Sequence, residues 1–274
     1  MYSRYSVILL FITIIFTFCT QNSEGAEEKT KMLTDSIPYE GVFSFGKNKG
    51  YIRIPNNYDP QKKYPLIVFF HGRGGSALKN NFTSEAFKTF REKASQNGYI
   101  VAVPAYGTNS WFNEDAENIT LGMLDFLNKN LSLASGYYVM GCSMGGGSAL
   151  VFAARHKEKV KAVCDIFGVT DYARFYNEGH YCDSIAKAYG GLPSEKPQFY
   201  QDRSAINHIE DLKDIPVLVI HGDKDSTVPK WNSDLLVEKL KQANGKMEYI
   251  VVPGKGHENA IARNLEDKIF SWFR

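Results

Sequence analysis

Continuous apolar runs recur along the chain and predict the strands of a buried sheet. Three of them, at 65–70, 215–220 and 247–252, are rich in β-branched or aromatic residues and lead into glycine-containing segments. Runs of this length without alternating polar positions are typical of strands covered on both faces. Shorter apolar runs at 99–103, 137–140 and 160–165 predict three more strands of the same kind.

Segments with helical patterning lie between these runs. They predict helices over 84–96, 121–131, 146–154, 232–243 and 257–273. Two further strands, near 41–45 and 51–54, are joined by Gly46-Lys47-Asn48-Lys49-Gly50 and predict an antiparallel start. Because strands and helices then alternate, we expect an α/β fold whose mostly parallel sheet carries helices on both faces.

The stretch Gly141-Cys142-Ser143-Met144-Gly145 lies between the predicted strand 137–140 and the small-residue helix 146–154. A serine on a sharp strand-to-helix turn projects its hydroxyl above the edge of a sheet, and flanking glycines let strand and helix approach closely. The sequence therefore predicts a nucleophile elbow with Ser143 at its tip.

Two other segments follow predicted strands and carry the groups that an activated serine needs. One contains Asp223 and Asp225, after the strand 215–220, and the other contains His257, after the strand 247–252. A serine hydroxyl requires an adjacent base, and a neutral imidazole suits that task near neutral pH. The imidazole in turn requires a carboxylate to orient it, which either aspartate could supply. We expect His71 and His221 to support their loops instead.

With serine, acid and histidine in this order, the sequence resembles the α/β-hydrolase family over nearly the whole mature chain. The stretches 204–209 and 215–229 are most similar to single-domain esterases akin to dienelactone hydrolases and to the catalytic domain of prolyl oligopeptidases. The resemblance implies an α/β-hydrolase fold with a small cap insertion. It also places the acid at Asp225, which leaves Asp223 as a turn residue.

The same resemblance implies an oxyanion hole built from backbone amides. Met144, directly after the nucleophile, should supply one amide, and the glycine-rich loop after the strand 65–70 should supply the other. Arg73 is the first candidate there and Gly74 the next. The Arg73 side chain has two interpretations: it grips a carboxylate of the substrate, or it is a solvated loop arginine that contributes only its amide.

Two segments do not fit the strand–helix alternation and are candidates for substrate contact. The loop 106–113 follows a strand and contains Trp111, which either lines a pocket or anchors the loop. The insertion 169–208 is rich in tyrosine and phenylalanine and stands where this family carries its cap. Its aromatic residues either enclose a substrate or bury the cap against the body of the protein.

Composition narrows the function classes. The chain has 274 residues, 43% hydrophobic and 23% charged, with a formal net charge of +2. Residues 26–274 suit one domain, and so weak a charge gives no argument for nucleic acid or a membrane surface as a partner. Histidine, cysteine and carboxylate residues show no metal-ligand spacing, so we expect no metal and no cofactor.

The N-terminus predicts a leader over residues 1–25. Its apolar run, 7–18, is shorter than a membrane span and fits the core of a signal peptide, so we expect export and no span in the mature chain. Cleavage after Cys19 or Gly25, lipidation at Cys19 and an uncleaved anchor all remain open. A disulfide between Cys164 and Cys182 also remains open in an exported chain.

The leading hypothesis is a serine hydrolase that cleaves carboxylic esters through an acyl-enzyme on Ser143, acting on small-molecule or polysaccharide-linked esters. A peptidase of the prolyl oligopeptidase type is the alternative. A binding protein that has kept the fold without its chemistry is the third hypothesis. No motif indicates the oligomeric state.

Overall fold

The apolar runs form strands of an eight-stranded sheet in a computed structural model that describes residues 31–274. The run 247–252 is an edge strand in which no residue is buried, so the prediction that it is covered on both faces is wrong. The spatial order is β1-β2-β4-β3-β5-β6-β7-β8; β1 and β2, and β2 and β4, pair antiparallel, and all other pairs are parallel. The strands are β1 (Glu40–Phe45), β2 (Asn48–Arg53), β3 (Tyr64–Phe70), β4 (Ile100–Pro104), β5 (Leu133–Cys142), β6 (Val160–Ile166), β7 (Val217–Gly222) and β8 (Met247–Val252).

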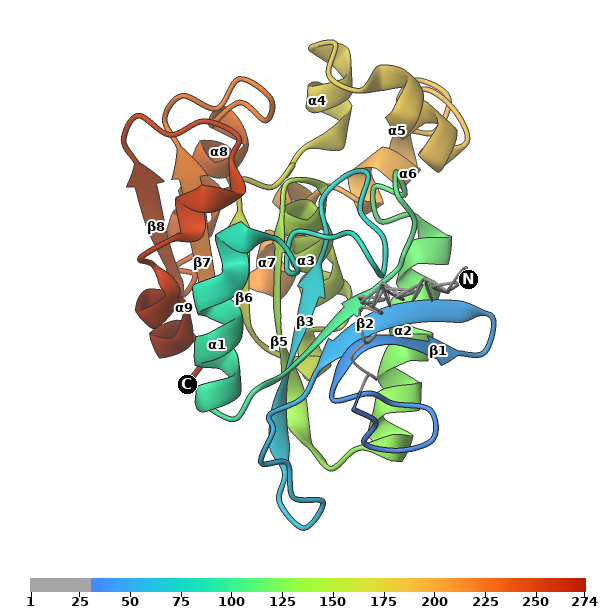
Figure 1. Cartoon of the computed structure of the whole chain (residues 1–274). Helices are drawn as coiled ribbons and strands as arrows, with labels where there is room; N and C mark the ends of the chain where they lie inside the picture. Colours follow the sequence, from blue (N-terminus) through green and yellow to red (C-terminus); the bar gives the residue numbers. More distant parts are fainter. Residues whose placement is uncertain (1–30) are drawn as a thin grey trace, which may run out of the picture.

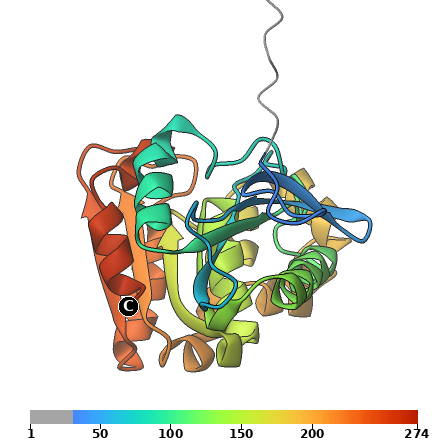
Figure 2. The same ribbon diagram turned by 60° about the horizontal axis from the view of Figure 1, so that its bottom comes forward.

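Helices cover both faces of this sheet (Figure 1, Figure 2). The α-helices are α1 (Lys88–Gln96), α2 (Glu114–Asn130), α3 (Met144–Arg155), α4 (Tyr172–Asn177), α5 (Cys182–Tyr189), α6 (Pro197–Asp202), α7 (Ile209–Leu212), α8 (Trp231–Gln242) and α9 (Glu266–Trp272). Short 3-10 turns are η1 (Glu85–Phe87), η2 (Lys157–Lys159), η3 (Ala205–Asn207) and η4 (Asn259–Ala262).

Strand β3 shows how the sheet separates two hydrophobic cores. Leu66, Val68 and Phe70 point into the core shared with α2, α3 and α8, whereas Ile67 and Phe69 point into the core shared with α1 and α9. All five side chains are completely buried, as expected of a central strand covered on both faces. The predicted α/β-hydrolase fold is confirmed.

The predicted helix over 257–273 is wrong in its first half. Helix α9 begins only at Glu266, and the residues between β8 and α9 form a loop that contains η4. Gly254 and Asn264 take positive φ values of 72° and 66°, which a helix does not allow. His257 therefore lies on a loop and not at a helix terminus.

The boundaries of several other elements also differ from the predicted ones, and two of them have a clear physical reason. Helix α2 begins at Glu114, seven residues before the predicted start, because the Asn113 side chain accepts a hydrogen bond from the Ala116 amide at 3.1 Å and caps the first turn. The turn between β1 and β2 is shorter than predicted. Only Gly46 and Lys47 separate the two strands, since Phe45 already pairs with Asn48.

The segment 169–208 lies between β6 and β7 and carries α4, α5 and α6, which stand together at the top right of Figure 1. Tyr172, Phe175, Tyr189 and Tyr200 are buried and pack against the body of the protein. Tyr181 is half-buried. Most aromatic side chains of this segment therefore serve packing.

The three cysteines of the described residues form no disulfide. Cys142, Cys164 and Cys182 are free thiols, so Cys164 and Cys182 are not bonded to each other. The leader prediction and the candidate lipidation at Cys19 lie outside the described residues and stay predictions. Between residues 31 and 274, no helix is both long enough and apolar enough to cross a membrane.

Candidate active site

The turn between β5 and α3 holds Ser143 in a strained conformation. Its φ of 58° and ψ of −124° lie outside the usual regions for a residue with a side chain. A Cβ atom at Gly141 would overlap the carbonyl of Gly145, and one at Gly145 would overlap the carbonyl of Phe70. The two glycines therefore let β5, β3 and α3 approach closely enough to form the turn, as the sequence predicts.

His257 and Asp225 lie in line with this serine. The Ser143 Oγ is 2.9 Å from His257 Nε2, and His257 Nδ1 is 2.7 Å from Asp225 Oδ2. With Nδ1 protonated, the imidazole donates to the carboxylate and accepts from the serine hydroxyl. The structure thus brings together the three residues that the sequence predicts, from the ends of β5, β7 and β8.

The Asp225 carboxylate is buried and held by several donors. Its Oδ1 accepts from the amides of Thr227 and Val228, each at 2.9 Å, and its Oδ2 also lies 3.5 Å from His221 Nε2. Burial by itself opposes the charge, but the hydrogen bonds from His221, His257 and Val228 hold the pKa of Asp225 well below its usual range. The group is therefore a fixed negative charge beneath the imidazole.

The other candidates for acid and base lie elsewhere. Asp223 accepts a hydrogen bond from the Gly254 amide at 2.6 Å and so connects two loops. His221 contacts Ser233 and Val228, and buried His71 contacts the Gly72 carbonyl. Burial lowers the pKa of His71 to about 4. Within the described chain, no group of three or more His, Cys, Asp or Glu side chains is arranged to hold a metal ion.

Backbone amides near Ser143 separate into free and engaged ones. In the described part of the chain, the amides of Arg73 and Met144 donate to no protein acceptor; Met144 is the first residue of α3, where helical amides have no partner within the helix. The Gly74 amide donates to the Thr108 carbonyl at 2.6 Å. Gly74, the alternative candidate for the second oxyanion donor, is therefore already engaged, and Arg73 remains the candidate in this loop.

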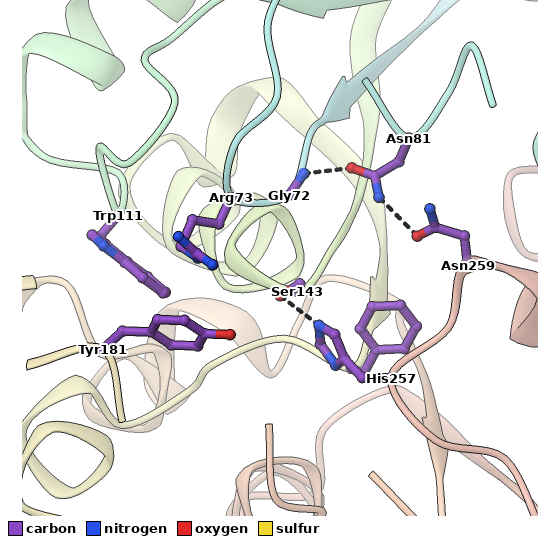
Figure 3. Close-up of a pocket in the computed structure, with 9 residues that line it drawn as sticks. Gly72, Arg73, Asn81, Trp111, Ser143, Tyr181, His257 and Asn259 are labelled. Atoms are coloured by element: carbon purple, nitrogen blue, oxygen red, sulfur yellow. Dashed lines mark hydrogen bonds between the residues drawn. The ribbon is translucent and has the colours of Figure 1, made fainter. Parts of the chain in front are cut away.

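Ser143 opens into a pocket of about 250 Å³ (Figure 3). Gly74 does not line it and borders an adjacent hollow instead. Five residues of the wall are absent from the predicted site, namely Gly72, Asn81, Phe167, Tyr181 and Asn259. The complete wall is formed by Gly72, Arg73, Asn81, Trp111, Ser143, Phe167, Tyr181, His257 and Asn259.

Asn81 joins the loop after β3 to the histidine loop. Its Oδ1 accepts from the Gly72 amide at 2.5 Å, and its Nδ2 donates to Asn259 Oδ1 at 2.7 Å (Figure 3). The side chain thus fixes the His71–Gly72 peptide, one peptide before the Arg73 amide, relative to the loop that carries His257. No motif in the sequence signals this contact, because its partners are 178 positions apart.

Trp111 combines both of its predicted roles. It lines the pocket, yet its side chain is only 1% exposed, and its Nε1 donates to Ser184 Oγ at 2.8 Å. The Tyr189 hydroxyl donates to the Trp111 carbonyl at the same distance. Trp111 therefore anchors the loop 106–113 to α5 and presents only an edge to the pocket.

Comparison with known proteins identifies the family to which the chain is similar. Residues 85–274 match the model of the prolyl oligopeptidase family. Dipeptidyl-peptidase 5 of Porphyromonas endodontalis is 26% identical over 230 residues, which cover 76% of this chain and 32% of that protein. The chain spans about a quarter to a third of the length of the first curated relatives that it matches.

Solved structures share the fold. The acylaminoacyl peptidase of Pyrococcus horikoshii superposes with a TM-score of 0.70 at 17% identity, covering 88% of this chain and 42% of that one. Est1E of Butyrivibrio proteoclasticus superposes with a TM-score of 0.63 at 19% identity, covering 84% of this chain and 95% of that one. The chain belongs to the prolyl oligopeptidase family of α/β-hydrolases.

Proposed function

We propose that the protein is a serine hydrolase that cleaves carboxylic esters through an acyl-enzyme on Ser143. The observation that carries the proposal is the chain of contacts from Ser143 through His257 to the buried Asp225, at 2.9 Å and 2.7 Å. Within the described chain, no other serine combines this contact to a histidine with a position at the tip of an elbow. Membership of the prolyl oligopeptidase family supports the same class of chemistry.

The proposed reaction has two balanced halves. Ser143 Oγ attacks the ester carbonyl carbon while its proton passes to His257 Nε2, and the amides of Arg73 and Met144 donate hydrogen bonds to the oxyanion. The bond to the alcohol oxygen then breaks, and the alcohol leaves with the proton from His257. Water repeats the sequence: its proton passes to His257, its oxygen attacks the acyl carbon, and Ser143 recovers its proton as the acid departs.

The charge of the pocket favours esters over peptides with a free N-terminus. A peptidase that recognises the free N-terminus of its substrate needs a carboxylate to bind the ammonium ion. The residues that line the pocket include no aspartate or glutamate, and Arg73 places a positive charge there. An approaching ammonium group would therefore be repelled.

The test is hydrolysis of 4-nitrophenyl acetate, butyrate and octanoate by the wild type beside Ser143→Ala and His257→Ala. We expect turnover by the wild type and a loss of at least about a thousandfold in each variant. Full activity in Ser143→Ala would refute the mechanism. A folded wild type that hydrolyses none of these esters would be either a peptidase or a binding protein without chemistry.

Peptide hydrolysis is the second candidate, because the relatives include a dipeptidyl-peptidase and an acylaminoacyl peptidase. Alanyl and prolyl 4-nitroanilides, assayed beside the three esters, separate the two activities. Faster release of 4-nitroaniline than of 4-nitrophenol at equal substrate concentration would make peptide hydrolysis the first candidate and ester hydrolysis the second.

We also propose that the chain is exported, on the basis of the apolar run 7–18 and the polar residues after it. Sequencing the N-terminus of the protein recovered outside the cytoplasm tests this proposal. A new N-terminus after Cys19 or Gly25 supports cleavage, and an intact Met1 contradicts it.

A further inference from the structure

Arg73 is a positive charge at the active site without a negative partner. No carboxylate of the described residues lies within salt-bridge distance of its guanidinium, and no protein group accepts a hydrogen bond from it. The other two arginines close to the cap segment differ: Arg174 pairs with Glu178, and Arg203 pairs with Glu117. The Arg73 charge is thus available to a substrate.

An aromatic platform holds this guanidinium at the pocket. The Arg73 guanidinium carbon lies 4.4 Å from the centroid of the Tyr181 ring, which is a cation–π contact. Tyr181 takes a φ of 48° at the start of α5, and its ring lies 5.6 Å from that of Trp111. Since Trp111 is itself fixed by Ser184 and Tyr189, the platform is attached to a packed wall and not to a free loop.

The guanidinium lies on the acyl side of the nucleophile. His257 must deliver its proton to the leaving oxygen, so the alcohol part of the ester lies next to His257 Nε2. Figure 3 shows Arg73, Trp111 and Tyr181 on the opposite side of Ser143 from His257 and Asn259. A group that reaches Arg73 therefore belongs to the acyl part of the substrate.

We propose that Arg73, held over Tyr181, forms an anion subsite, and that the preferred substrates are esters whose acyl group carries a second, free carboxylate. The inference rests on the proposed esterase function. A guanidinium presents a planar fork that matches a carboxylate, and the neutral platform leaves its outward N–H groups free to donate. The same charge should disfavour an acyl group that ends in an ammonium ion.

The experiment compares the mono(4-nitrophenyl) esters of adipic and suberic acid with the same esters methylated at the free carboxylate. These pairs differ in charge and keep the same chain, and the two lengths scan the distance to Arg73. We expect the wild type to prefer the anionic member of at least one pair by about tenfold in kcat/KM, with the preference declining as salt increases.

Three variants test whether the preference for the anionic ester comes from the Arg73 side chain. Arg73→Gln keeps the backbone amide and should lower kcat/KM for the anionic ester about tenfold more than it lowers kcat/KM for the neutral ester. Tyr181→Ala should weaken the preference in the same direction. Lys79→Gln removes an exposed positive charge from the same loop, outside the pocket wall that contains Ser143, and should leave the preference unchanged.

The outcomes are distinct. Equal loss for the anionic and neutral esters in Arg73→Gln would overturn the subsite, because the side chain would then act on the oxyanion or on the fold. If the wild-type protein hydrolyses both esters without a preference for the charged one, the anion subsite would also be overturned, and the proposed function would stand. Failure of the wild type to hydrolyse either ester would reject the proposed function itself.

Discussion

The charge on Asp225 is the residue-scale feature on which the proposed mechanism depends. Asp225→Asn should lower kcat by about 10³- to 10⁴-fold, because an amide neither holds the Nδ1–H tautomer of His257 nor stabilises the imidazolium. Asp223→Asn is the matched control, since Asp223 lies on the same loop and contacts the Gly254 amide instead of the imidazole. For both variants, hydrolysis of 4-nitrophenyl butyrate measures the effect on activity, and thermal unfolding measures the effect on stability. An equal loss of activity in both variants would contradict the assignment.

Asn81 is a positioning residue whose effect should appear in kcat. Asn81→Ala removes the link between the Gly72 amide and Asn259, so we expect kcat to fall about tenfold with little change in KM, because the Arg73 amide loses its fixed direction. Asn81→Asp keeps an acceptor for the Gly72 amide and should recover most of the loss. Steady-state kinetics of the two variants provide the test, and a wild-type kcat in Asn81→Ala would refute it.

The sequence predicts the reacting residues better than the residues that support them. Ser143, His257 and Asp225 each follow a strand in a fixed order, and the geometry brings them together. Asn81 and Tyr181 reach the site through contacts between distant parts of the chain, which no local pattern encodes. The sequence could not decide between Arg73 and Gly74 as the second oxyanion donor, because Thr108, which engages the Gly74 amide, comes from another loop.

The close approach of β3 and α3 sets a prediction at the scale of elements. Gly145→Ala would drive a methyl group into the Phe70 carbonyl, so we expect loss of the folded protein or destabilisation by about 3 kcal/mol or more. Gly122→Ala, on the exposed side of α2 with nothing closer than 4.0 Å, should stabilise by about 0.5–1 kcal/mol. Urea unfolding of both variants measures the contrast. Equal stability of the two variants would contradict the packing argument.

The sequence predicts the strands more accurately than it predicts the ends of the helices. The central strands have apolar runs long enough to identify. The edge strand β8 also has the predicted bounds 247–252, although none of its residues is buried. Helix boundaries depend on single side chains, such as Asn113 at the start of α2, and on backbone φ values, such as that of Asn264 before α9. A predicted helix that begins at His257 therefore continues the apolar pattern too far towards the N-terminus.

At the scale of the whole molecule, one buried carboxylate connects three parts of the fold. Glu117 of α2 accepts from Arg155 Nε at 2.8 Å, from His156 Nε2 at 2.9 Å and from Arg203 at 2.8 Å. Arg155 and His156 lie at the end of α3, and Arg203 follows α6 in the cap segment. The cap is therefore attached to the body by a charge cluster as well as by its aromatic side chains.

This cluster predicts how stability depends on pH. Burial opposes the charge on Glu117, but the hydrogen bonds from His156, Arg155 and Arg203 lower the pKa to about 2, from an ordinary value near 4.5. A carboxyl group whose pKa is lowered by folding stabilises the native state above the unfolded pKa and loses that contribution as pH falls through the folded pKa. The contribution of about 3 kcal/mol should thus be complete above pH 5 and disappear between about pH 4.5 and pH 2.

Glu117→Gln tests this dependence directly. The variant should be less stable than the wild type by about 3 kcal/mol at pH 7. The difference should shrink steadily as pH falls below about 4.5, because the Glu117 carboxylate of the unfolded wild type takes up a proton there while the folded state remains ionised. Urea unfolding at a series of pH values measures that difference. Glu85→Gln, at an exposed site 4.0 Å from Lys88, should change stability by less than about 0.5 kcal/mol at any pH. A difference for Glu117→Gln that stays constant from pH 7 to pH 2.5 would show that the charge of Glu117 contributes nothing to attaching the cap.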